Sequence, residues 1–154
     1  MIKTILIVSD FSVESLYCVE NLLSNNKNNT RFSIIFLYGA DSTEYSIDLL
    51  FYSKSRIIRD RTKSGFDEAL DALKSTYSSK IYAAKKEVFF ENYQIAFDNF
   101  LSFNQVSEIY LPECKVDDYK GNNNIFKFIK NSGLPIHYTR SLFSTEYSES
   151  GLVA

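Results

Sequence analysis

Three polar residues that could take part in chemistry follow directly on the first apolar run of the chain. Ser9, Asp10 and Ser12 come after Ile5–Val8, a continuous apolar segment typical of strands buried in parallel sheets. Ligands of open parallel sheets bind outside the carboxyl ends of the strands, so a carboxylate and two hydroxyls at this point can orient a small molecule. The same residue types also form turns and helix caps. The sequence leaves both the binding role and the capping role open.

Other catalytic or metal-binding chemistry has little support in the sequence. His137 is the only histidine, and it falls in a predicted strand with no nucleophile near it in sequence. Cys18 and Cys114 lie far apart and have neither the spacing of a zinc site nor that of a disulfide scaffold. Neither a dinucleotide-binding glycine fingerprint nor a P-loop occurs. We therefore expect a protein that is not an enzyme and that holds no metal.

Composition and charge narrow the class of protein further. The chain has 154 residues, a net charge of −2 and a sequence pI of about 5.5, which argues against dedicated binding to nucleic acid or to an anionic membrane. The first apolar run is too short for a secretory signal or a membrane span, so we expect a cytoplasmic protein. The segment 54–63 carries five basic residues, which we interpret as a charged helix face, with an anion- or partner-docking patch as the alternative.

Strands and helices alternate in the pattern of hydrophobic residues. The pattern predicts strands at about 5–8, 32–38, 80–87, 108–111 and 136–140, and helices at about 13–24, 39–63, 66–77, 92–101 and 125–133, with Asn92 as a helix cap. Such alternation indicates an α/β fold with a doubly wound five-stranded parallel sheet and helices on both faces. We expect one domain over 1–143 and a flexible C-terminal tail over 144–154.

The element order resembles the universal stress protein superfamily. The segment Val8-Ser9-Asp10-Phe11-Ser12, which closes the first strand, and the segment 131–136, in which Pro135 precedes the last strand, carry the resemblance. It implies a Rossmann-like sheet of order 3-2-1-4-5, a role in stress response, and a ligand crevice at the switch point between strands 1 and 4. In nucleotide-binding members of the family, the acidic residue equivalent to Asp10 contacts the nucleoside.

The loop after the fourth strand departs from the nucleotide-binding pattern. In those relatives, the motif Gly-x-x-Gly, nine residues and Gly-Ser/Thr cradles the phosphates, because backbone without side chains lets N–H groups approach them. Here the segment 112–120 has no glycine and holds three acidic residues, and only Gly121-Asn122 resembles the end of the motif. We therefore expect a degenerate crevice, without a cofactor, lined by Ser9, Asp10, Ser12, Gly121 and Asn122.

Two functions remain open, and both involve this crevice. The first is a dimeric regulatory or interaction module that acts on a protein partner. The second is an adenine-nucleotide binder that takes ATP with Mg and hydrolyses it weakly or not at all, with Lys115 or Lys120 neutralising phosphate. The strand at 136–140 lies at the predicted sheet edge, where an uncovered strand can pair with a second chain. Family members without the glycine loop often dimerise near this strand, so we expect a homodimer through it.

Overall fold

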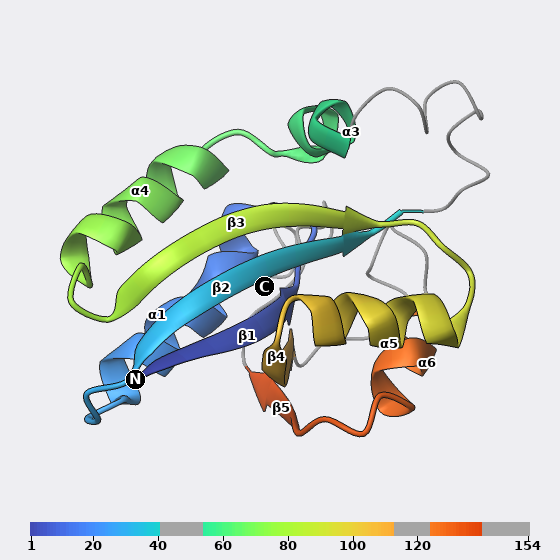
Figure 1. The fold of residues 1–154 in the computed structure, drawn as a ribbon. Helices are drawn as coiled ribbons and strands as arrows, with labels where there is room; N and C mark the ends of the chain where they lie inside the picture. The colour runs from blue at the N-terminus through green and yellow to red at the C-terminus, as the bar shows by residue number, and fades with distance from the viewer. Residues whose placement is uncertain (41–53, 113–123, 140–154) are drawn as a thin grey trace, which may run out of the picture.

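A five-stranded parallel sheet forms the centre of the molecule (Figure 1). The computed structural model describes residues 1–40, 54–112 and 124–139. The strand order is β3-β2-β1-β4-β5, and every neighbouring pair is parallel. The strands are β1 (Ile2–Val8), β2 (Arg31–Gly39), β3 (Ile81–Phe89), β4 (Val106–Pro112) and β5 (Ile136–Thr139). The predicted fold class and sheet order are thereby confirmed.

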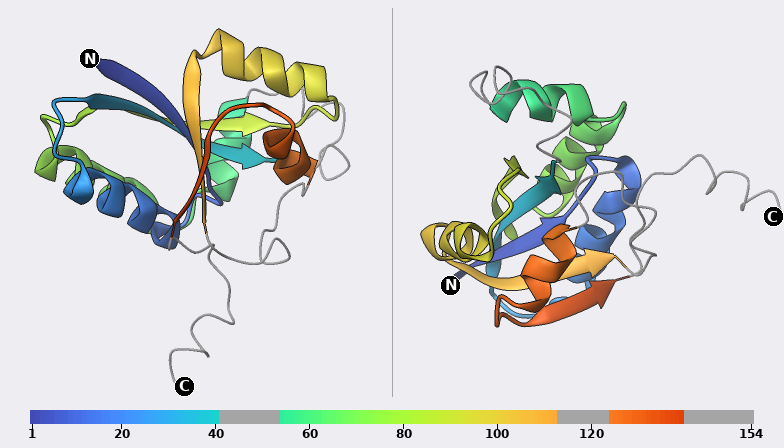
Figure 2. Two further views of the ribbon diagram at one scale, coloured as in Figure 1. Left: turned by 90° about the horizontal axis from the view of Figure 1, so that it is seen from below. Right: turned by 90° about the vertical axis from the view of Figure 1, so that its right-hand side faces the viewer.

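Helices cover both faces of this sheet (Figure 2). On one face lie α1 and α4, and on the other lie α5 and α6. The short 3-10 helix η1 leads into α1, and α3 precedes α4. Their bounds are η1 (Val13–Leu16), α1 (Tyr17–Asn25), α3 (Lys54–Arg61), α4 (Phe66–Thr76), α5 (Gln94–Phe103) and α6 (Asn124–Lys130).

The core forms where the apolar runs of the sequence predict it. Side chains in the second half of β1, Ile5–Val8, are almost fully buried, because helices lie on both sides of that strand. Between the sheet and α5, Phe97 packs its ring against Phe89, Phe100 and Phe128 with centroids 5.3–6.5 Å apart. The phenylalanines at 89 and 97 thus fill the core, as their positions on apolar faces predict.

Several local predictions need correction. The N-cap position of α5, directly before Gln94, is occupied by Tyr93, so Asn92 is not its cap. The first helix starts as a 3-10 turn at Val13 and becomes α-helical only at Tyr17. The helix predicted over 39–63 is helical at 54–61, and its portion 41–53 lies outside the described residues, as does the tail 144–154. β1 begins at Ile2, earlier than the apolar run, because Ile2, Lys3 and Thr4 pair with β2.

Candidate functional site

The loop that follows β1 is built around a chain of buried hydrogen bonds. The backbone N–H of Phe11 donates to the Ser9 hydroxyl over 2.8 Å, and the Ser9 and Ser15 hydroxyl oxygens lie 2.8 Å apart. The Ser15 hydroxyl donates to the Ser12 carbonyl over 2.6 Å. Because the Ser15 proton is used there, the Ser9 hydroxyl donates to Ser15. All three serines are buried, so this chain satisfies polar groups that water does not reach.

Asp10 lies beside this series of hydrogen bonds, and its carboxylate contacts both Ser12 and Lys63. Its Oδ1 accepts hydrogen bonds from the backbone N–H of Ser12 over 3.2 Å and from the Ser12 hydroxyl. Its Oδ2 lies 3.4 Å from the Lys63 ammonium, which also donates to the Asp10 carbonyl over 3.0 Å. Only 2% of Asp10 is exposed. The carboxylate is therefore buried among donors that belong to this chain.

The Lys63 backbone ties the same loop to the segment between α3 and α4. Its N–H donates to the Phe11 carbonyl over 3.0 Å. Phe11 adopts a left-handed conformation with φ 57°, which turns the chain sharply after Asp10. Its fully buried ring packs against Tyr38 and Phe66, at centroid distances of 5.9 and 6.0 Å. The ring, the backbone hydrogen bond and the ion pair together fix the position of Asp10.

Gly65 lets α4 approach this loop closely. Its φ of 88° lies in the left-handed region, where a side chain is strained. A Cβ at Gly65 would lie 3.3 Å from Val13 Cγ2, so a larger residue would press against η1. The start of α4 and the start of η1 can therefore pack together at the end of β1.

The structure brings part of the predicted site together. Ser9, Asp10 and Ser12 lie in one buried cluster, whereas Gly121 and Asn122 lie outside the described residues, as do Lys115 and Lys120. Ser12 does occupy the N-cap position directly before η1, but its hydroxyl donates to Asp10 rather than capping the helix.

Lys63 and Ser15 also belong to this cluster, although neither residue was predicted to do so from the sequence. Lys63 is 53 residues from Asp10 in sequence, and no local pattern signals a contact at that distance. Ser15 lies on the predicted helix, and its spacing of three residues from Ser12 is the one available signal.

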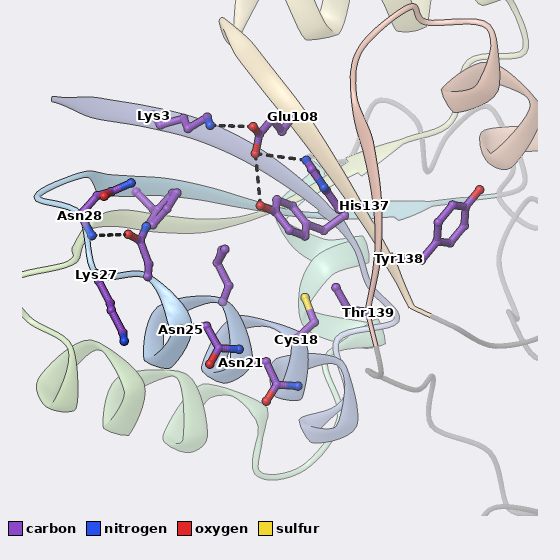
Figure 3. Close-up of a pocket in the computed structure, with 14 residues that line it drawn as sticks. Lys3, Cys18, Asn21, Asn25, Lys27, Asn28, Glu108, His137, Tyr138 and Thr139 are labelled. Atoms are coloured by element: carbon purple, nitrogen blue, oxygen red, sulfur yellow. Dashed lines mark hydrogen bonds and ion pairs between the residues drawn. The ribbon is translucent and has the colours of Figure 1, made fainter.

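A second polar cluster spans three neighbouring strands on the face that carries α1 (Figure 3). Glu108 on β4 is its centre. Its Oε1 accepts a hydrogen bond from the Lys3 ammonium of β1 over 2.6 Å. Its Oε2 accepts a hydrogen bond from the Tyr110 hydroxyl over 3.1 Å and lies 3.5 Å from Nε2 of His137 on β5. The His137 and Tyr110 rings stack with centroids 4.8 Å apart.

The second cluster shifts the pKa values of its members in opposite directions. Burial by itself raises the pKa of Glu108, but the hydrogen bond and charge of Lys3, the Tyr110 hydrogen bond and the charge of His137 outweigh it, so the pKa lies below its ordinary value. Burial and the neighbouring Glu108 raise the pKa of Tyr110, which stays protonated as a donor. Burial raises the pKa of the nearby Cys18 thiol to about 12, although Thr139 lowers it, so this thiol is unreactive at neutral pH.

Glu108 makes stability depend on pH in the acid range. A carboxyl whose pKa is lower in the folded state than in the unfolded chain stabilises the fold above its unfolded pKa of about 4.3. That contribution is lost as the pH falls through the folded pKa. We therefore expect the stability of Glu108→Gln, measured by urea unfolding, to fall less than that of the wild type between about pH 5 and pH 3. The exposed Glu20→Gln is the control, and equal acid sensitivity of all three proteins would contradict the assignment.

Comparisons with known proteins identify the fold. No protein-family model matches the sequence, and no curated protein does. The solved structure of a hypothetical protein, MJ0577, superposes with a TM-score of 0.56 at 14% identity, covering 94% of this chain and 97% of that one. A universal stress family protein from Burkholderia pseudomallei gives 0.53 at 14% identity, covering 90% and 96%. A universal stress protein in complex with cAMP gives 0.51 at 13% identity, covering 91% and 98%. The chain has the fold of the universal stress proteins.

Two features are absent from the described residues. Within 1–40, 54–112 and 124–139, no helix is both long and apolar enough to cross a membrane. The same ranges hold no group of three or more His, Cys, Asp or Glu residues arranged to bind a metal ion. The expectations of a cytoplasmic location and of a protein without a metal stay predictions.

Proposed function

We propose that this protein is a non-catalytic regulatory or interaction module of the universal stress protein type, which acts as a homodimer and has a degenerate nucleotide crevice. One observation carries the proposal: the Asp10 carboxylate is 2% exposed and is bound by Ser12 and Lys63. A nucleoside that used this carboxylate would have to displace donors that the chain itself supplies. Such an exchange contributes little binding free energy, because hydrogen bonds from the nucleoside only replace those from Ser12 and Lys63.

The sequence of the loop after β4 supports the same proposal. Segment 112–120 lacks glycine and carries Glu113, Asp117 and Asp118, whose charges oppose a polyphosphate. In the proposed module, Asp10 therefore has a structural role, in which it joins the end of β1 to the segment before α4. The fold is kept while the ligand site is lost.

Nucleotide binding is the second candidate function. It is favoured by the universal stress protein of similar fold whose structure was solved in complex with cAMP. In this alternative, Lys115 or Lys120 neutralises phosphate, Gly121-Asn122 supplies backbone donors, and Mg accompanies ATP. Lys63 would then have to release Asp10 when the nucleoside enters. Direct detection of bound nucleotide separates the two candidates.

We place the homodimer contact at β5. This strand is four residues long and lies at one end of the strand order, so one of its edges has no neighbour in the described sheet. Such an edge offers backbone N–H and C=O groups to a second chain. Tyr138 on β5 is 59% exposed and provides apolar surface beside that edge. A symmetric pairing of β5 with β5 would extend the sheet from one subunit into the other.

Placing a charge on β5 tests this interface. We expect the wild type to sediment as a dimer and Tyr138→Lys to shift it towards monomer, because a lysine on an edge strand hinders pairing with another chain. The control is Tyr93→Lys, which alters a tyrosine just before α5 that is 71% exposed. Analytical ultracentrifugation over a range of concentrations reports the mass. A monomeric wild type, or a dimer unaffected by Tyr138→Lys, would contradict the interface.

A further inference from the structure

A groove of about 910 Å³ lies on the face of the sheet that carries α1, between that helix and strands β4 and β5 (Figure 3). It is distinct from the crevice at Asp10, because Lys3, Glu108, His137 and Cys18 line it. Its volume falls within the range of small-molecule sites, about 300–1,000 Å³. Asn21 and Asn25 of α1 form the wall opposite Glu108.

Around Glu108, the groove presents hydrogen-bond donors to a ligand, because the carboxylate there is already engaged. Both carboxylate oxygens of Glu108 are already engaged, Oε1 by Lys3 and Oε2 by Tyr110 and His137. An ammonium carries three N–H groups, and Lys3 uses one of them on Glu108, while its side chain remains 30% exposed. His137 is 45% exposed at the sheet edge. A ligand that supplies acceptors therefore fits better than one that supplies donors.

Charge and apolar surface define the class of ligand. Among the described residues that line the groove, the ammonium groups of Lys3 and Lys27 and the carboxylate of Glu108 together leave one net positive charge. The whole chain, by contrast, has a net charge of −2. A monoanion balances this charge better than a phosphate monoester, which carries about two negative charges at neutral pH. Leu22 and Phe32 also line the groove and supply apolar surface for a hydrocarbon group.

We propose that this groove binds a small organic monocarboxylate. Its carboxylate accepts hydrogen bonds from the Lys3 ammonium, and its hydrocarbon part lies against Leu22 and Phe32. Glu108 does not contact the ligand through a free acceptor; its carboxylate contacts Lys3 and His137 and reduces the positive charge of the groove. This site is separate from the Asp10 cluster, but it shares β5 with the proposed dimer contact, because His137, Tyr138 and Thr139 also line the groove.

Benzoate, a carboxylate with one aromatic ring, is the probe. We expect backbone amide NMR signals of groove residues to shift saturably when benzoate replaces chloride at constant ionic strength.

Lys3→Met should weaken binding about tenfold, the loss expected for one charge-assisted hydrogen bond. Glu108→Gln should tighten binding severalfold, because it removes the opposing charge; a purely structural role for Glu108 predicts the reverse sign. Lys130→Met, which alters an exposed lysine of α6, should bind benzoate like the wild type.

Several outcomes overturn the proposal. NMR shifts that do not saturate, or that spread over the whole surface, would contradict it. Equal benzoate affinity in the wild type and in Lys3→Met would also contradict it. If inorganic phosphate binds more tightly than benzoate, the ligand is not a monocarboxylate. If groove signals respond to protein concentration but not to benzoate, a second copy of the chain covers the groove instead. Lys63→Met should leave benzoate affinity unchanged, so failure at the Asp10 cluster and failure at the groove can be told apart.

Discussion

Replacing Phe11 with alanine is expected to destabilise the protein by about 3–5 kcal/mol, the usual cost of deleting a large buried aromatic side chain. Its ring is fully buried between Tyr38 and Phe66. The backbone of residue 11 keeps its left-handed conformation in the variant, so strain there is not relieved while the packing is lost. The free energy of unfolding from urea denaturation measures the effect.

Phe103→Ala is the matched control for this experiment. Phe103 is a phenylalanine of the same size at the end of α5, but it is 87% exposed, so its loss should change stability by less than about 0.5 kcal/mol. If Phe11→Ala cost no more than Phe103→Ala, the ring of Phe11 would not hold the β1 loop in the way the structure shows.

Replacing Lys63 with methionine is expected to cost about 2–3 kcal/mol. Methionine keeps the length of the side chain but removes the ammonium that lies 3.4 Å from the buried Asp10 carboxylate. Removing one partner of a fully buried pair typically costs about 3–5 kcal/mol, and we expect less here because 42% of the Lys63 side chain is exposed to water. The Asp10 carbonyl also loses a donor.

A double-mutant cycle isolates the pairing of Lys63 with Asp10. Asp10→Asn keeps an acceptor for Ser12 but removes the charge, so adding it to Lys63→Met should restore part of the lost stability. The interaction free energy between the two sites should exceed about 1 kcal/mol, whereas the exposed Lys127→Met of α6 should be additive with Asp10→Asn. Strict additivity of Lys63→Met and Asp10→Asn would mean that the ion pair does not stabilise the fold.

The strands were the most predictable part of this fold. Ile5–Val8 is apolar throughout because both of its faces are covered, and that property can be seen in the sequence without a partner. The ends of strands were harder to place. The apolar run does not extend to Lys3 and Thr4, which belong to β1 because they pair with Phe32 and Ser33. The strand order came from the family resemblance, since hydrophobic periodicity does not determine it.

The candidate site was predictable only where it is local in sequence. Ser9, Asp10 and Ser12 follow one strand, so a polar cluster at its carboxyl end was expected. The contact between Asp10 and Lys63 was not, because Lys63 approaches from the segment before α4. The cluster at Glu108 depends on the strand order, which places β4 between β1 and β5. Contacts of this kind follow from tertiary structure and leave no periodic signal in the sequence.

The central claim is that the crevice at Asp10 no longer serves nucleotide. Native mass spectrometry of freshly purified protein, with and without added Mg-ATP, tests it most directly, because one spectrum reports both the mass of the assembly and any bound nucleotide. We predict a dimer with no nucleotide adduct under either condition. An adenine nucleotide bound in stoichiometric amount would contradict the claim and would move the search for the phosphate site to Lys115, Lys120 and Gly121.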